Sequence, residues 1–154
     1  MLSRQATHAL KALLLLAAEP QAWQSTHALA VAQQLPEPML EQLLLRLRRT
    51  GLLTARRGRL GGYRLARPAR EIALATVLAG LGEPVGPGAP GLQSHRDDGA
   101  EPQASAADQV TAALERRLER ARQKALAELS LEDLLFDLRS AEASRDEQGG
   151  LLLG

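Results

Sequence analysis

The sequence predicts a mainly α-helical protein that contains one small β-hairpin. Apolar residues recur at helical spacing in three stretches, residues 3–18, 39–47 and 108–129. Residues 52–66 instead form two short runs on either side of a glycine-bearing turn, a pattern typical of a hairpin. Apolar residues make up 45% of the 154 residues and aromatic residues only 2%, so we expect a core of Leu, Ala, Val and Ile.

The N-terminal part is expected to hold three helices, and the first two contain no proline. The first covers residues 3–18 and ends before Pro20, which cannot continue a helix. Ser25 and Thr26 are candidate caps for a short second helix over residues 27–34, because their hydroxyls can accept a bond from a free backbone N–H.

The third predicted helix follows a proline-marked turn. Pro36 and Pro38 cannot lie inside a helix, although Pro38 suits a first turn. From Met39 onward the apolar spacing is helical, and Gly51 is the expected C-terminal stop. The second and third helices therefore form a pair joined by a tight turn.

The hairpin and a fourth helix complete the first domain. "LLTARR" and "GGYRLA" are the two strands, and "EIALATVLAGLGE" is a short helix. This order of elements is the outline of a winged helix-turn-helix, in which the second helix of the pair enters the DNA major groove and the hairpin, or wing, reaches an adjacent groove or the backbone. In residues 56–66 four arginines surround three glycines, which favours close approach to phosphates; a solvated hairpin turn is the alternative.

The C-terminal part is expected to be a loop and two helices. We assign residues 1–83 to the winged domain, 84–107 to a flexible Pro/Gly-rich loop, 108–143 to a long helix and a closing helix, and 144–154 to a frayed tail. The long helix carries an apolar stripe without an obvious partner in so small a domain. We expect this stripe to form a homodimer, with packing on the first helix of the same chain as the alternative. Its members are Val110, Leu114, Leu118, Ala121, Ala125 and Leu129.

The charge is divided between the two halves of the chain. Residues 1–70 carry 11 Lys/Arg and 3 Asp/Glu, whereas residues 71–154 carry 8 and 15. Such a division suggests that one surface faces a polyanion, with an accident of surface charge as the alternative.

Catalysis, a membrane span and a disulfide have little support. The chain has no cysteine, and its three histidines, His8, His27 and His95, are scattered without catalytic or metal-ligand spacing. The apolar run "ALKALLLLAAEP" is too short to span a bilayer and lacks a clear cleavage pattern. We therefore expect a cytoplasmic protein that is not an enzyme and holds no cofactor or metal.

One long stretch resembles a known family. "LEQLLLRLRRTGLLTARRGRLGGYRLARPAREIAL" is similar to the bacterial winged-helix transcriptional regulators that include IscR, NsrR and CymR, and "HALKALLLLA" and "SLEDLL" resemble the first helix and closing segment of that family. The resemblance implies a dimeric DNA-binding regulator, usually a repressor, paired through the long C-terminal helix. Sensing members hold an iron–sulfur cluster with three cysteines in the loop that matches residues 84–107, and this chain has none there.

The resemblance also places candidate DNA-binding residues. Glu41 and Gln42 would lie at the groove-facing start of the third helix, where a carboxylate can accept from cytosine and glutamine can pair with adenine; an ordinary first-turn acid is the alternative for Glu41. Arg57-Gly58 matches the Arg-Gly pair of the wing, and Tyr63 is expected to pack the wing against the domain. The full expected set is Glu41, Gln42, Arg46, Arg56, Arg57, Gly58, Arg59 and Arg64.

Some positions depart from the family. Pro36, Pro38 and Met39 stand where many relatives have hydroxyl residues and a tyrosine that lead into the third helix. We expect a homodimeric, sequence-specific DNA-binding regulator, a repressor, that acts without a cluster. Its signal, if it has one, is expected to be a small molecule or a protein partner, with regulation by protein concentration alone as the alternative. The alternative is an interaction or scaffold protein that keeps the winged helix and has lost specific DNA binding.

Overall fold

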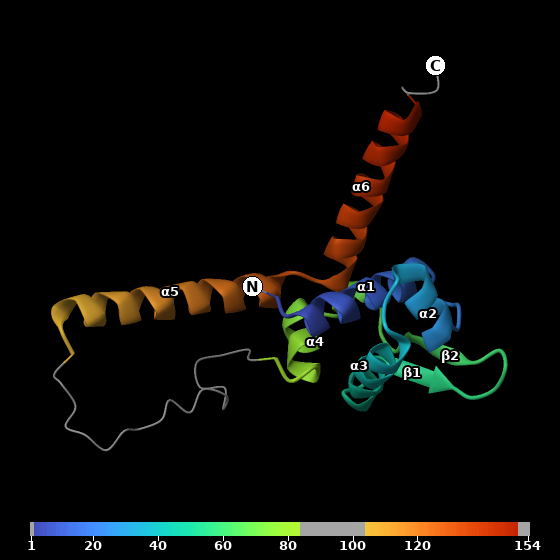
Figure 1. Cartoon of the computed structure of the whole chain (residues 1–154), viewed down its shortest axis with the longest axis horizontal. Coiled ribbons are helices and arrows are strands. Elements are labelled where there is room, and N and C mark those ends of the chain that lie inside the picture. Colours follow the sequence, from blue (N-terminus) through green and yellow to red (C-terminus); the bar gives the residue numbers. More distant parts are fainter. Residues whose placement is uncertain (1, 84–103, 151–154) are drawn as a thin grey trace.

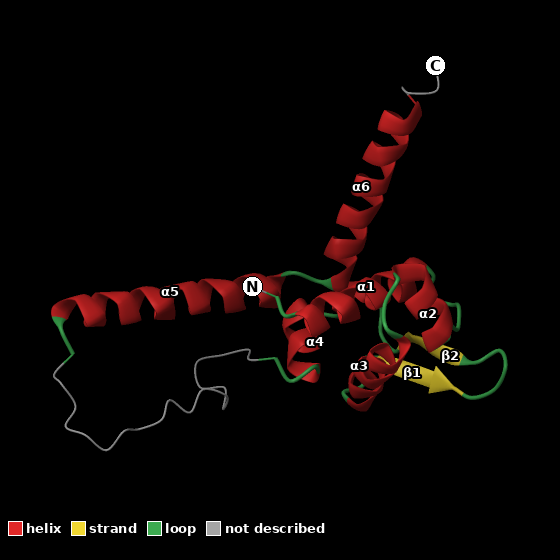
Figure 2. Ribbon diagram, in the orientation of Figure 1, coloured by secondary structure: helices red, strands yellow, loops and turns green. Residues whose placement is uncertain are grey.

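The computed structural model describes residues 2–83 and 104–150, and the predicted mainly helical architecture with one hairpin is confirmed. Figures 1 and 2 show a compact group of short elements from which two longer helices project. The elements are α1 (Arg4–Ala18), α2 (Thr26–Gln33), α3 (Glu37–Arg49), β1 (Leu53–Arg56), β2 (Gly62–Leu65), the 3-10 helix η1 (Ala69–Glu71), α4 (Leu74–Gly80), α5 (Ala106–Glu128) and α6 (Leu131–Gly150).

Helix α1 lies at the centre of the core. Its N-cap Ser3 accepts a hydrogen bond from the Ala6 backbone N–H at 3.0 Å, and the Ser3 hydroxyl also donates to Glu83 just beyond α4. One face of α1 is buried against α2, α3, β2 and α6. The buried positions of α1 are Ala6, Ala9, Leu10, Ala12, Leu13, Leu16 and Ala17.

The α2–α3 pair has a tight turn, as predicted. Ser25 caps α2 by accepting from the Ala28 N–H at 3.1 Å. Gln34 ends α2 in the left-handed conformation at φ 54°, and the Leu35 N–H then donates to the Ala30 carbonyl at 2.9 Å. At the other end of α3, Gly51 takes φ 81° and the Leu52 N–H donates to the Leu47 carbonyl at 3.1 Å, which closes the helix.

The wing is a two-stranded antiparallel sheet in which Leu53 lies opposite Leu65 and Arg56 lies opposite Gly62. The segment before α2 pairs with β2 through an isolated antiparallel bridge, in which Gln24 and Tyr63 exchange backbone hydrogen bonds of 3.0 and 2.8 Å. A Cβ on Gly62 would lie 2.3 Å from the Gln24 carbonyl oxygen, and Gly62 has φ 141°. Only glycine therefore permits this close backbone pairing.

The two C-terminal helices join the winged domain through a short backbone bridge. The Leu74 N–H donates to the Leu129 carbonyl at 2.9 Å, and the Leu131 N–H donates to the Ile72 carbonyl at 2.8 Å. Leu131 and Leu135 at the start of α6 are buried in the core. In contrast, α5 contains no buried residue and projects away from the domain (Figure 1).

The C-terminal helix is longer than predicted. The sequence predicts a frayed tail from residue 144, but α6 continues to Gly150. Ser140 and Ser144 donate back to the carbonyls of Phe136 and Ser140, both at 3.0 Å, so polar side chains there bond within the helix. Helix α5 begins at Ala106, where Ser105 and Asp108 form a capping box. Of the predicted loop, residues 84–103 lie outside the described part, as do residues 151–154 of the tail.

Within residues 2–83 and 104–150, none of the helices combines the length and the apolar content that crossing a membrane requires.

Candidate nucleic-acid interface

Helix α3 has one apolar face and one exposed polar face. Its buried positions are Leu40, Leu43, Leu44 and Leu47, which pack into the core. Gln42 and Arg49 are exposed on the opposite side, seven residues apart and therefore on one stripe of the helix. Gln42 is among the predicted DNA-binding residues, whereas Arg49 is not, although the same helical spacing identifies it.

Glu41 connects three elements. Its carboxylate accepts hydrogen bonds from the Thr26 hydroxyl at 2.5 Å and from the Tyr63 hydroxyl at 3.4 Å. Thr26 is the first residue of α2 and Tyr63 belongs to β2, so Glu41 holds the start of α3 between the first helix of the pair and the wing. Both carboxylate oxygens thus have partners within the protein, an arrangement that neither sequence interpretation of Glu41 included.

Tyr63 packs inward, as predicted. The residue is 8% exposed, and its backbone pairs with Gln24. Burial and the neighbouring Glu41 carboxylate raise the pKa of the Tyr63 phenol, and Arg48 opposes part of that rise. The base of the wing is therefore fixed beside the beginning of α3.

Two of the predicted arginines are held at the base of the wing by an aromatic ring. The guanidinium carbons of Arg64 and Arg56 lie 4.3 and 5.4 Å from the ring centroid of Trp23. Both distances are within the range of cation–π attraction, which is worth about 0.5–1 kcal/mol at exposed sites. Trp23 is not among the predicted site residues, because nothing in its local pattern links it to strands that come much later in the chain.

Arg46 also has a partner within the protein. Its guanidinium donates to the Leu81 carbonyl at 3.5 Å, so the side chain lies toward the end of α4. This long contact satisfies a carbonyl at a helix C-terminus, where cations are favourable.

The tip of the wing is fully open. Arg57, Gly58, Arg59 and Leu60 are exposed, and Leu60 is 79% exposed despite its apolar side chain. Gly58 takes φ 104° and has no heavy atom within 4 Å of a Cβ position, and its carbonyl accepts from the Gly61 N–H at 3.0 Å. The tip is therefore a tight turn that presents two arginines without a carboxylate beside them.

The ion pairs do not include the arginines of this surface, although Glu37, a member of one pair, is the first residue of α3. Among the residues that the structure describes, side-chain pairs within 4.0 Å join His27 to Glu37 at 2.9 Å and Arg122 to Glu119 at 3.6 Å. Neither pair includes an arginine of α3 or of the wing, so the positive charge of that surface is not neutralised locally.

The predicted dimerisation residues are exposed along α5 and at its C-cap, Leu129. Val110, Leu114, Leu118 and Leu129 are 69%, 54%, 61% and 42% exposed. Ala121 and Ala125 on the same stripe are exposed as well. The alternative in which this stripe packs on the first helix of the same chain is therefore contradicted.

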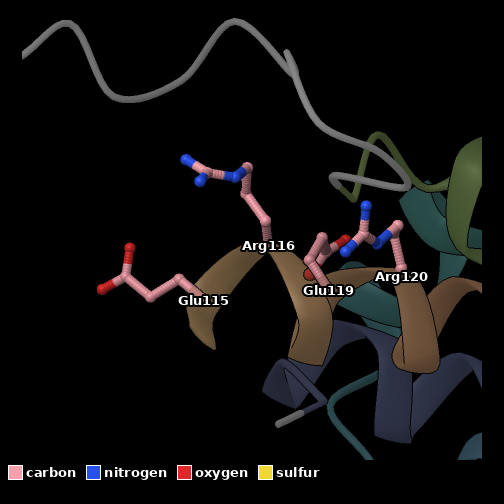
Figure 3. Close-up of a pocket in the computed structure, with 4 residues that line it drawn as sticks. All are labelled: Glu115, Arg116, Glu119 and Arg120. Atoms are coloured by element: carbon pink, nitrogen blue, oxygen red, sulfur yellow. The ribbon is translucent and has the colours of Figure 1, made fainter. Parts of the chain in front are cut away.

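A pocket of about 300 Å³ lies on α5, bordered by Glu115, Arg116, Glu119 and Arg120. Figure 3 shows that Glu115 and Arg116 point away from one another and from the other two side chains. Acid and base alternate on one helix here without converging on a common point, and such an arrangement is typical of a solvated helix face.

These features define a class of protein: a helix pair with a tight turn, followed by an arginine-tipped two-stranded wing, is a winged helix-turn-helix DNA-binding domain. The chain belongs to the Rrf2 family, described as "Iron-dependent Transcriptional regulator", whose profile matches residues 2–137. A candidate HTH-type transcriptional regulator of Synechocystis sp. is 39% identical over 147 residues, which cover 95% of each chain. IscR of Cereibacter sphaeroides is 47% identical over 53 residues, 34% of each chain.

Solved structures agree with this assignment. CymR, the global cysteine regulator of B. subtilis, aligns with a TM-score of 0.69 at 27% identity over 88% of this chain and 95% of its own. IscR of T. potens aligns with a TM-score of 0.70 at 27% identity over 92% of this chain and 90% of its own. The predicted resemblance and fold class are thereby confirmed.

The family description names iron, and the donor set of this chain does not fit a cysteine-held cluster. Its 154 residues contain no cysteine, whose thiolate is the usual cluster ligand. In residues 2–83 and 104–150, no three His, Asp or Glu side chains are grouped so that they could hold a metal ion. His95, Asp97 and Asp98 lie outside the described residues.

Proposed function

We propose that the protein is a homodimeric, sequence-specific DNA-binding repressor of the cytoplasm that acts without an iron–sulfur cluster. The observation that carries the proposal is the Glu41 link. Because Glu41 binds Tyr63 of β2, the exposed stripe of α3 and the arginine wing are held side by side. A winged domain that reads DNA needs this arrangement of helix and wing.

The proposed DNA contacts divide into residues that read bases, residues that bind phosphates and residues that support the surface. Gln42 on the outward stripe of α3 can read base edges in the major groove, and Arg49 is placed to bind a phosphate at the end of that helix. Arg57 and Arg59 at the wing tip suit an adjacent minor groove or its phosphates. Arg56 and Arg64, which stack on Trp23, and Arg46, which bonds to Leu81, support the surface rather than reading bases.

A second copy of the chain is the proposed partner of α5. Four large apolar side chains on one stripe are more than half or nearly half exposed, and burial against a two-fold mate removes them from water. Two recognition helices would then lie about 34–36 Å apart, one turn of DNA.

The test is fluorescence polarisation with an operator duplex selected from random DNA. Arg57→Ala is expected to weaken binding by about 1–3 kcal/mol, the range for one good base contact. Arg145→Ala, which removes an exposed arginine from α6, is the matched control and should leave affinity unchanged.

Two results contradict the proposal. Unchanged affinity in both Arg57→Ala and Arg59→Ala shows that the wing is not a reader. Failure of the unmodified protein to bind any duplex at low salt supports instead the interaction protein without DNA binding, which Pro36 and Pro38 at the start of α3 would then explain.

The cluster-free part of the proposal has its own measurement. Protein purified without oxygen should carry neither stoichiometric iron nor acid-labile sulfide after desalting, because no thiolate is present to hold them. Retained iron and sulfide in a fixed ratio would overturn it.

A further inference from the structure

A second cavity lies between the winged domain and α6, separate from α3 and the wing tip. Its volume is about 520 Å³, and it is bordered by the end of α1, the chain from β2 to η1, and the first turns of α6. Leu65 and Leu135 form a buried apolar floor. A volume and a floor of this kind are typical of sites for small molecules.

The rim of this cavity is strongly basic. Arg64, Arg67, Arg70 and Arg139 border it, against a single carboxylate, Glu132. No ion pair within 4.0 Å involves any of these five side chains among the described residues. Four arginines, from β2, the segment between β2 and η1, η1 itself and α6, therefore border an apolar floor.

We propose that this cavity, which we call the arginine pocket, binds a small organic anion that carries at least two negative charges. Guanidinium groups bind carboxylate and phosphate with paired, charge-assisted hydrogen bonds, and the apolar floor accommodates the carbon skeleton. A double-stranded DNA backbone is a poorer occupant, because α6 leaves the domain on the side opposite to α3 in Figure 1.

One residue connects the arginine pocket to the wing. Arg64 borders the pocket and also stacks on Trp23, with Arg56 of the paired strand on the same ring. An anion that draws Arg64 toward the pocket competes with this stack and loosens the base of the wing. The bound anion would thus lower DNA affinity, an effector role that rests on the function proposed above.

Calorimetry tests the pocket itself without DNA. Citrate and glucose 6-phosphate are the probes, which separate carboxylate from phosphate recognition, and uncharged glucose is the control. We expect at least one anion to bind the unmodified protein, and Arg67→Gln/Arg139→Gln to weaken that binding at least about tenfold. Arg145→Gln, farther along α6, should bind as the unmodified protein does. No heat with either anion, or equal affinity in the double variant, overturns the proposal.

Fluorescence polarisation with the operator duplex then measures whether the bound anion changes DNA affinity, a question separate from anion binding itself. A saturating anion should weaken duplex binding about fivefold or more in the unmodified protein, within the usual range of allosteric coupling, and should have no effect on the double variant. If the double variant loses duplex affinity without any anion, its arginines bind DNA phosphates and the anion pocket is refuted. If the anion binds but no duplex does, the pocket stands and the proposed DNA-binding function fails.

Discussion

The winged domain buries its apolar side chains within a single chain, whereas α5 leaves its apolar side chains exposed. Leucines of α1, α3 and α4 meet in one core, where Leu13, Leu44 and Leu47 are fully buried. Helix α5 has an apolar stripe of similar chemistry, yet its largest side chains, including Leu118 at 61% exposure, face solvent. Similar residues at similar spacing are thus buried in the core of the winged domain and exposed to solvent on α5.

The difference shows where each region obtains its stability. The winged domain is stabilised by its own core, whereas α5 is held by its capping box, by the backbone hydrogen bond from Leu74 to its C-cap Leu129, and by its contact with α4. Isolated helices are marginal in water, so a stripe of this length gains most from a partner. Substitutions in α5 and in the core test this contrast, and substitutions at the wing and at the α2–α3 turn then test what stabilises the winged domain, in order of decreasing expected effect.

Leu118→Glu should abolish the proposed dimer. A charge placed at the centre of the stripe would be buried twice across a two-fold axis, at about 3–5 kcal/mol for each unpaired charge. Sedimentation equilibrium at micromolar concentration should then show monomers. Gln109→Glu adds the same charge to α5 away from the stripe and should leave the dimer intact. A monomeric unmodified protein would contradict the proposed dimer.

Leu44→Ala should cost about 2–5 kcal/mol of unfolding free energy, because the residue is fully buried and its removal leaves a cavity. The matched change Leu114→Ala, made in the monomeric Leu118→Glu background, should cost less than about 0.5 kcal/mol, since that side chain is already exposed. Urea unfolding measures both. Equal costs would show that α5 is buried within a single chain.

Tyr63→Phe should cost about 0.5–1.5 kcal/mol at neutral pH, through loss of the hydrogen bond to Glu41. The pKa of Tyr63 is raised in the folded protein, so its contribution is complete below the ordinary pKa of about 10 and declines as pH rises above it. The gap in unfolding free energy between the unmodified protein and the variant should therefore narrow above that pH. A constant gap would show that the phenol is not perturbed by folding.

Gln34→Gly should stabilise the winged domain slightly, by about 0.5 kcal/mol, because glycine takes the left-handed conformation without the penalty that glutamine has. Ala32→Gly, two residues earlier at an exposed position inside α2, should instead destabilise by about 1 kcal/mol. Thermal unfolding distinguishes them. Destabilisation by both would mean that the α2–α3 turn depends on the Gln34 side chain.

Periodicity and turn residues predicted most of the fold. The spacing of Leu40, Leu43, Leu44 and Leu47 fixed the buried face of α3, and Gly51 marked its end, because both signals are local. The extension of α6 was missed because its last turns have neither an apolar stripe nor a capping residue, only residues that tolerate helix.

The candidate site was predicted only in part. The arginines of the wing tip were predicted from one continuous stretch of sequence, and the apolar stripe of α5 was predicted from its helical spacing. The Thr26–Glu41–Tyr63 contact and the Trp23 stack join residues from elements that are distant in the chain. No periodic pattern contains such pairs, since they depend on how the strands cross the helices.

Trp23 is an intrinsic fluorescence probe of the wing. It is the only tryptophan of the chain, and two guanidinium groups of the wing lie over its ring. The emission of the indole depends on the charges and the water around it, so the intrinsic fluorescence of the unlabelled protein reports on a single place, the base of the wing. Movement of either arginine changes that signal directly, while events confined to α5 do not reach it.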